Sequence, residues 1–381
     1  MMIGPPGAAP DSQTALAIEN PPNGAVLNRH DGRETPDGLL AQVSGSCPPG
    51  AAVSLNRQPA SIAANRFSSE LLLTKRRNRI RAETTINGQR LSDEIVLLWD
   101  WQSFKRYRFS VDDNIMFLKD LGLYPHGYNS LFDHWYLAFW RRIHQQFGTK
   151  IHLNIYYQTD AFDLTQMPDK WRDEWEANAG WLHLSFHALA DKPDRPYRNA
   201  TYAQIAHDHD LVMGHIRRFA GNEVTSRVTT LHWAECPKHA VRALRDRGID
   251  ILIGLFDMTG PLQSTGYYFD VPTCRYVNTR DYFYDPQVDM TYLCCDMVVN
   301  NVPLVQIAPA LEKQAESPHT GELMELLIHE QYFREDLPGL YQPDAQDRVR
   351  RALEWVTQQG YQPIFWGEGF CGNQAPPPVR R

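Results

Sequence analysis

Several features that would place a chain in a special class are missing from this 381-residue sequence. Its apolar runs, such as 134–140, fall short of the roughly 18 residues that cross a membrane. The first residues lack the basic start and apolar core of a secretory signal. A formal net charge of −7 gives no electrostatic reason to bind nucleic acid, and six scattered cysteines are too few for a disulfide framework. We expect a cytoplasmic protein with free thiols, or an extracytoplasmic one whose signal was removed.

The chain is long enough for two or three domains, or for one large barrel with a small module, at roughly 150 residues per domain. Residues 17–100 contain short alternating segments at about ten-residue spacing, broken by turn residues such as Asn87-Gly88. This pattern predicts a small all-β sandwich. The predicted strands are 25–27, 39–43, 52–55, 67–73, 78–82 and 94–98. Residues 1–16 and 373–381 are predicted to be flexible.

Residues 101–372 follow a different pattern, in which short apolar strands alternate with amphipathic helices. Such alternation indicates βα units and a parallel sheet. We therefore predict the α/β class, with a distorted (β/α) barrel of about seven parallel strands. The predicted strands are 107–111, 151–157, 181–186, 229–233, 251–255, 326–328 and 361–366, and the predicted helices include 202–220, 237–247 and 345–359.

Catalytic residues of parallel barrels lie where the strands end, and the first predicted strand ends in Asp112 and Asp113. Adjacent residues of an extended chain point in different directions. One carboxylate is therefore free to bind a metal while the other accepts a proton. The alternative is that the pair caps the following helix, whose positive end favours acids.

A second strand ends in His187, and Asp191 follows four residues later. Together with Asp113 they would supply the three ligands of a catalytic zinc site. The alternative is a core histidine and a surface aspartate.

Two further strand ends carry polar groups. His329 follows the late strand, and a histidine can donate a proton near neutral pH. The alternative is a buried structural histidine, which is the commoner case. Glu330 comes next and is a candidate for substrate binding. Trp233 and Glu235 follow an earlier strand. Flat rings pack against sugars, so Trp233 and Tyr267 are candidates for substrate stacking, and Asn154 is a further candidate for lining the cavity.

The order of these pieces resembles the polysaccharide deacetylase (NodB-homology) family over about residues 107–368. The matching features are the strand that ends in Asp112-Asp113, the His187-x-x-x-Asp191 segment, Pro237 before a helix, and the late Leu-Leu-Ile-His329. Residues 17–100 resemble the immunoglobulin-like modules of bacterial carbohydrate-active proteins, on pieces such as Val43-Ser44-Gly45.

The deacetylase resemblance implies metal-dependent removal of an acetyl group from an oligo- or polysaccharide. It implies that Asp112 is the base, that Asp113 and His187 bind the ion, and that His329 is the general acid. The ion would be zinc, with nickel, cobalt or manganese as alternatives. Asp191 stands where the family usually has a second histidine, and Glu235 stands where an arginine normally orients the base.

Two other functions remain open from the sequence. Asp112, Glu235 and Glu330 would supply the paired carboxylates of a glycoside hydrolase, and a lyase on the same scaffold is a related possibility. An inactive carbohydrate-binding protein would keep the scaffold without the chemistry.

Overall fold

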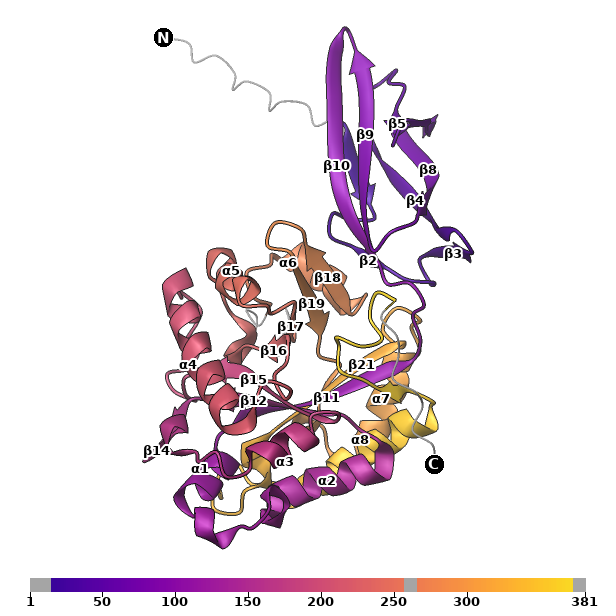
Figure 1. The fold of residues 1–381 in the computed structure, drawn as a ribbon. Coiled ribbons are helices and arrows are strands. Elements are labelled where there is room, and N and C mark those ends of the chain that lie inside the picture. The colour runs from indigo at the N-terminus through magenta and orange to yellow at the C-terminus, as the bar shows by residue number, and fades with distance from the viewer. Residues whose placement is uncertain (1–14, 257–265, 373–381) are drawn as a thin grey trace, which may run out of the picture. The chain divides into compact units, whose positions relative to one another are not determined.

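The computed structural model describes residues 15–256 and 266–372, and the chain divides into two compact units between Ser103 and Phe104 (Figure 1). The predicted flexible segments 1–16 and 373–381 lie outside the described residues, apart from residues 15 and 16. All six cysteines are buried thiols. None of the described helices has the length and apolar character needed to cross a membrane.

Residues 15–103 form strands and no helix. The strands are β1 (Ala17–Asn20), β2 (Val26–Leu27), β3 (Gly32–Thr35), β4 (Gly38–Ser46), β5 (Ser54–Leu55), β6 (Gln58–Pro59), β7 (Ser61–Ala63), β8 (Arg66–Leu73), β9 (Arg77–Ile86) and β10 (Gln89–Trp99). They make two five-stranded sheets, β1-β4-β8-β7 with β3 beside β4, and β2-β10-β9-β5-β6. The immunoglobulin-like identity of this unit stays a prediction.

The hairpin of β9 and β10 illustrates how the sequence dictates this unit. Asn87 and Gly88 both have positive φ, 50° and 77°, as a tight hairpin turn of the favoured hand requires. Along β9 every second side chain from Asn78 to Thr84 is buried, so one face of the strand supplies core and the other meets solvent.

The second unit contains short strands between longer helices. Its strands are β11 (Arg106–Asn114), β12 (Ile151–Tyr156), β13 (Gln158–Thr159), β14 (Phe162–Asp163), β15 (Leu182–Ala188), β16 (Val228–Thr230), β17 (Ile251–Gly254), β18 (Tyr282–Asp285), β19 (Met290–Cys294), β20 (Met297–Val298), β21 (Leu323–His329) and β22 (Gln362–Pro363). Its α-helices are α1 (Met116–Leu123), α2 (Trp135–Phe147), α3 (Arg172–Ala177), α4 (Tyr202–Ala220), α5 (Lys238–Asp246), α6 (Val271–Asn278), α7 (Ile307–Ala315) and α8 (Ala345–Gln358).

Most strand pairs of this unit are parallel. The order β15-β12-β11-β21-β20 is parallel throughout, and β22 pairs with the start of β11. In a second sheet β16, β17 and β19 are parallel, and only the edge strand β18 is antiparallel. An isolated parallel bridge links Leu184 of β15 to Thr225, which lies shortly before β16. The predicted α/β class with parallel strands is confirmed, while closure into one barrel stays a prediction.

Two predicted strands are shorter than expected. The strand in the segment 229–233 ends at Thr230, and Trp233 and Ala234, with φ values of 66° and 48°, turn the chain out of the sheet shortly afterwards. The segment 361–366 pairs only over Gln362–Pro363. The pair β18–β19 has no counterpart among the predicted strands.

Polar side chains fill the inner face of β11. Arg108 is fully buried and makes a bidentate ion pair with Glu325 on β21, with Nε–Oε2 and Nη2–Oε1 distances of 2.8 Å. Ser110 and Trp366 also donate hydrogen bonds to the Glu325 carboxylate. A buried charge pair is tolerated only when the remaining polar atoms are satisfied as well, and here both carboxylate oxygens have several donors.

The polar layer continues across β12 to the end of β11. Arg108 Nη1 lies 2.6 Å from His152 Nδ1, and His152 Nε2 lies 2.8 Å from the hydroxyl of Ser185. Ser185 in turn bonds to Asn154, whose amide donates to Asp112. The interior of the unit is therefore a hydrogen-bonded network that leads to the carboxylate at the strand end.

Replacement of Glu325 by alanine is expected to lower the free energy of unfolding by about 3–5 kcal/mol, because it leaves the guanidinium of Arg108 buried and uncompensated. Urea denaturation followed by tryptophan fluorescence measures the change. The exposed Glu312→Ala on α7 is the control and is expected to change stability by less than about 0.5 kcal/mol. Equal stabilities of the two variants would contradict the importance of the buried pair.

Candidate metal centre

A break in the regular backbone at the end of β11 separates the two adjacent aspartates. The pairing of β11 with β12 shifts register between Val111 and Asn114, and Asp113 has a φ of 62°. Aspartate is one of the few residues that tolerate this left-handed conformation. Asp112 stays in the ladder opposite His329 of β21. The two carboxylates therefore occupy different surroundings, as the sequence predicts.

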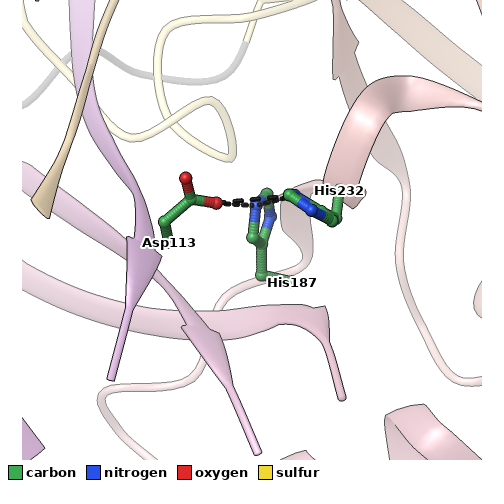
Figure 2. A group of neighbouring side chains, drawn as sticks. All are labelled: Asp113, His187 and His232. Carbon is green, nitrogen blue, oxygen red and sulfur yellow. Dashed lines mark hydrogen bonds and ion pairs between the residues drawn. The ribbon is translucent and has the colours of Figure 1, made fainter. Parts of the chain in front are cut away.

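Three side chains from three strand ends converge at this point (Figure 2). Asp113 Oδ1 lies 3.0 Å from His187 Nε2 and 3.4 Å from His232 Nδ1. The two ring nitrogens are 3.3 Å apart. His187 is at the end of β15, and His232 follows β16 in the turn that Trp233 and Ala234 create.

The outer atoms of both histidines fix which nitrogens face the centre. His187 Nδ1 contacts the carbonyl oxygen of Thr230, and His232 Nε2 lies 3.3 Å from that of Asp191. Carbonyl oxygens only accept, so these nitrogens carry the protons. In the neutral rings, His187 Nε2 and His232 Nδ1 then present lone pairs toward the oxygen of Asp113.

Three acceptor atoms at such separations repel one another unless a cation lies between them. A tetrahedral ion with bonds of about 2.0–2.1 Å holds its ligand atoms about 3.3–3.4 Å apart. The observed distances of 3.0, 3.3 and 3.4 Å agree with that spacing. Two imidazoles and one carboxylate are also ligands that zinc accepts. The chemistry and geometry of the donor set therefore fit a small divalent ion.

Burial and neighbouring charges lower the pKa of Asp113 and raise the pKa values of His187 and Asp112. Burial favours the neutral acid at Asp113, but His187 and His232, which donate hydrogen bonds to its carboxylate when they are protonated, hold its pKa well below the usual value. Burial disfavours the charged form of His187, yet the neighbouring carboxylates of Asp112 and Asp113 raise its pKa. At Asp112 burial dominates and raises the pKa. The site therefore favours a positive charge near two carboxylates.

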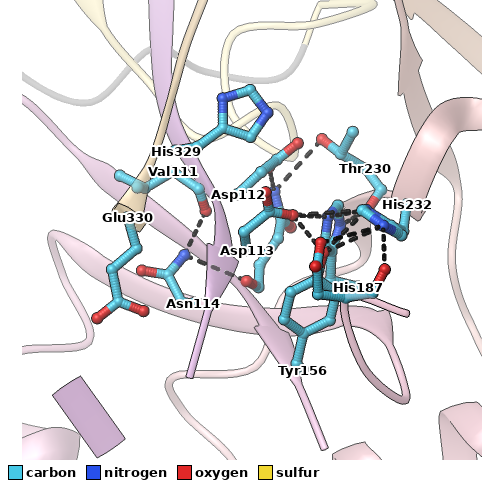
Figure 3. A network of polar contacts seen from close by, with 12 residues as sticks. Val111, Asp112, Asp113, Asn114, Tyr156, His187, Thr230, His232, His329 and Glu330 are labelled. Carbon is cyan, nitrogen blue, oxygen red and sulfur yellow. Dashed lines mark hydrogen bonds and ion pairs between the residues drawn. The ribbon is translucent and has the colours of Figure 1, made fainter. Parts of the chain in front are cut away.

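The centre opens into a cavity of about 330 Å3. Asp112 and His329 line it together with the three converging residues, and Asn300 holds His329 through an Oδ1–Nδ1 contact of 2.9 Å. Asp112 itself is buried and is held by the amide of Asn154. Figure 3 shows side chains that line this part of the cavity, among them Asp112, Asp113 and His329. The cavity thus presents a carboxylate and an imidazole beside the candidate metal ligands.

The structure places Asp191 at the rim of the cavity and outside the converging group. Its side chain is 62% exposed, and its nearest oxygen is 4.0 Å from His232 Nε2. The backbone carbonyl of Asp191, not its carboxylate, contacts the site. The group of three side chains that could hold an ion therefore contains His232, and the carboxylate of Asp191 lies outside it.

The sequence position of His232 also makes it a candidate ligand, although it is not among the ligands predicted from the sequence. It lies at a strand end between Leu231 and Trp233, as do the other candidate residues. A single histidine at a strand end is common, and the motif of the resembled family directs attention to position 191. Only the folded chain shows that His232 meets His187.

Of the four candidate substrate-binding residues, only Trp233 lines the cavity. Its ring lies 5.0 Å from the guanidinium of Arg195. Asn154 binds Asp112, and the hydroxyl of Tyr267 donates to the carbonyl of Ile253 at 2.6 Å.

The two glutamates are likewise not among the residues that line the cavity. Glu330 accepts hydrogen bonds from the backbone N–H groups of Ile115, Met116 and Phe117, so it caps α1 in place of the aspartate pair. Its carboxyl group points away from Asp113 in Figure 3. Glu235 is buried and forms an ion pair with Arg195, so that arginine neutralises its charge.

No family model and no curated protein matches the sequence. Among solved structures, a CE4 family pseudoenzyme from Bacillus anthracis is distantly similar, with 8% identity and a TM-score of 0.31 over 75% of this chain and 81% of that chain. A mutant of a CE4 family pseudoenzyme with restored enzymatic activity gives 7% identity and a TM-score of 0.32 over 74% and 84%. The 4-alpha-glucanotransferase of Thermococcus litoralis gives 11% identity and a TM-score of 0.45 over 69% of this chain but 38% of that chain. Because all three scores are below 0.5, the assignment of the site rests on its own geometry.

Zinc affinity is expected to fall as the pH is lowered, because protons compete for the two imidazoles. The raised pKa of His187 means that the fall begins above the usual histidine value of about 6.5. Titration calorimetry at a series of pH values measures it. In Asp112→Asn the fall is expected at lower pH, since Asp112 contributes the largest favourable charge to protonated His187. A pH-independent affinity would contradict coordination by these histidines.

Proposed function

We propose that the second unit is a metal-dependent hydrolase that removes an acetyl group from a saccharide. The observation that supports this most directly is the convergence of Asp113 Oδ1, His187 Nε2 and His232 Nδ1 at the mouth of a cavity. Three protein ligands at an open cavity are typical of catalytic rather than structural metal sites. A bound divalent ion would polarise the acetyl carbonyl and lower the pKa of a water molecule.

Asp112 is suited to accept the proton of the attacking water. It lines the cavity but is not among the converging ligands. Burial raises its pKa, which brings a carboxylate closer to the neutral range where a general base works best. The amide of Asn154 holds its Oδ1 and leaves the second oxygen for the proton. In this proposal Asn154 orients the base.

His329 is suited to protonate the departing amine or alcohol. It is the register partner of Asp112 in the parallel β11–β21 ladder, and both side chains line the same cavity. Its Nδ1 donates a hydrogen bond to the carbonyl oxygen of the Asn300 side chain. In the imidazolium form Nε2 carries a second proton, which it would give to the leaving group while the ring becomes neutral. Trp233 at the wall offers an aromatic face to a sugar ring.

The paired-carboxylate alternative finds less support in this arrangement. Glu330 caps α1 and Glu235 pairs with Arg195, and neither lines the cavity. A glycosidase would need a second acid across the scissile bond from Asp112.

Alanine substitutions distinguish the ligand set with His232 from the one with Asp191. Asp113→Ala and His232→Ala are expected to lose a stoichiometric divalent ion, because each removes one of three ligands. Asp191→Ala is the matched control and is expected to keep the ion, since its carboxylate lies outside the group. Elemental analysis after dialysis against zinc measures both. Loss of metal from Asp191→Ala with retention in His232→Ala would overturn the assignment.

Asp112→Asn is expected to keep its metal but to release acetate about 10²–10⁴ times more slowly than the wild type, because the general base is gone. His329→Gln is expected to show a loss of similar size. Acetate release from acetylated chito- and xylo-oligosaccharides is the assay, with Asp194→Asn at the cavity rim as the control. Shortened sugar chains without acetate would identify glycosidic cleavage instead. A metal-loaded wild type that binds sugar without turnover would identify a binding protein.

A further inference from the structure

Both oxygens of Asp113 are held by hydrogen-bond donors from neighbouring strands. The hydroxyl of Tyr156 donates to Oδ1, and Gln331 Nε2 donates to Oδ2 at 2.7 Å. Tyr156 is the last residue of β12, and Gln331 follows β21. Gln331 engages Oδ2, and Oδ1 is the oxygen of Asp113 that faces the two histidines.

Tyr156 contacts all three candidate ligands. Its hydroxyl lies 2.9 Å from His232 Nδ1 as well as beside Asp113. Its ring centroid is 5.1 Å from that of His187 and 5.2 Å from that of His232. The side chain is buried and is not among the residues that line the cavity, so it approaches the centre from the interior side.

The hydroxyl of Tyr156 carries one proton, and Asp113 is the acceptor with the greatest negative charge within its reach. A hydrogen-bond donor beside a coordinating carboxylate fixes the orientation of the carboxylate. The carboxylate then rotates less readily into a position where both of its oxygens bind the ion. Such outer contacts commonly change metal affinity by about 10–100-fold.

We propose that Tyr156 is a positioning residue of the metal centre, which together with Gln331 limits Asp113 to one coordinating oxygen. The inference rests on the proposed metal-dependent function. Its consequence concerns which ions bind. One oxygen and two nitrogens suit zinc or cobalt, with few ligands at short bonds. Manganese and calcium favour oxygen-rich sites, and calcium takes six to eight oxygen ligands with bidentate carboxylates.

The experiment compares Tyr156→Phe with Tyr157→Phe, the adjacent residue, whose ring lies against His215. Titration calorimetry with zinc, cobalt and manganese chlorides gives the affinities, and the visible absorption spectrum of the cobalt-loaded protein reports the ligand field. Tyr156→Phe is expected to bind zinc about 10–100 times more weakly and to alter the cobalt spectrum. Tyr157→Phe is expected to match the wild type in both. Wild-type affinity and spectrum in Tyr156→Phe would overturn the proposal.

Gln331→Leu provides a second variant in case Tyr156→Phe does not fold, because Gln331 is only partly buried at the cavity wall. Release of Oδ2 is expected to raise manganese affinity relative to zinc, and an unchanged ratio would count against the proposal. The titration of the wild type tests the proposed metal-dependent function independently of the role of Tyr156. If the wild type binds no metal, both the metal-dependent function and the role of Tyr156 are contradicted. If the wild type binds metal and the variants bind it equally well, only the role of Tyr156 is contradicted.

Discussion

The organisation of the second unit depends on one electrostatic constraint, the meeting of three hydrogen-bond acceptors at the ends of three strands. A carboxylate oxygen and two imidazole nitrogens lie 3.0–3.4 Å apart. Such an arrangement is stable only around a positive charge, whether a proton or a metal ion. The raised pKa of His187 and the lowered pKa of Asp113 are two expressions of the same constraint.

The surrounding structure holds these acceptors in place at some cost. Asp113 has a left-handed backbone, and so have Trp233 and Ala234 beside His232. Strained residues of this kind persist when the packing around them is rigid, and they are frequent at functional sites. Here the rigidity comes from backbone carbonyls that orient both histidines and from the donors on Asp113. The left-handed residues and these hydrogen bonds therefore hold the same three side chains in place.

A polar interior connects the site to the centre of the sheet. The ion pair of Arg108 with Glu325 is fully buried, and its hydrogen bonds extend through His152 and Ser185 to Asn154 and Asp112. Networks of this kind are stable only when nearly every member is satisfied. The arginine that the resemblance would place beside the base is absent, and an amide holds Asp112 instead. The contact at Asp112 within the described residues is therefore with a neutral amide.

The sequence by itself predicted many of the strands and helices of both units, because alternation and helical periodicity record which face of each element is buried, but it did not predict the pair β18–β19. It also offered Asp112, Asp113, His187 and His329 as candidate site residues, since polar residues at the ends of buried strands stand out from their apolar surroundings. Only the tertiary structure decided the third candidate ligand. His232 and Asp191 are both plausible from their positions along the chain. The choice depends on a turn at Trp233 and on contacts between strands about forty residues apart. The same holds for Glu330, Asn154 and Tyr156, whose partners lie on other strands and leave no local pattern in the sequence.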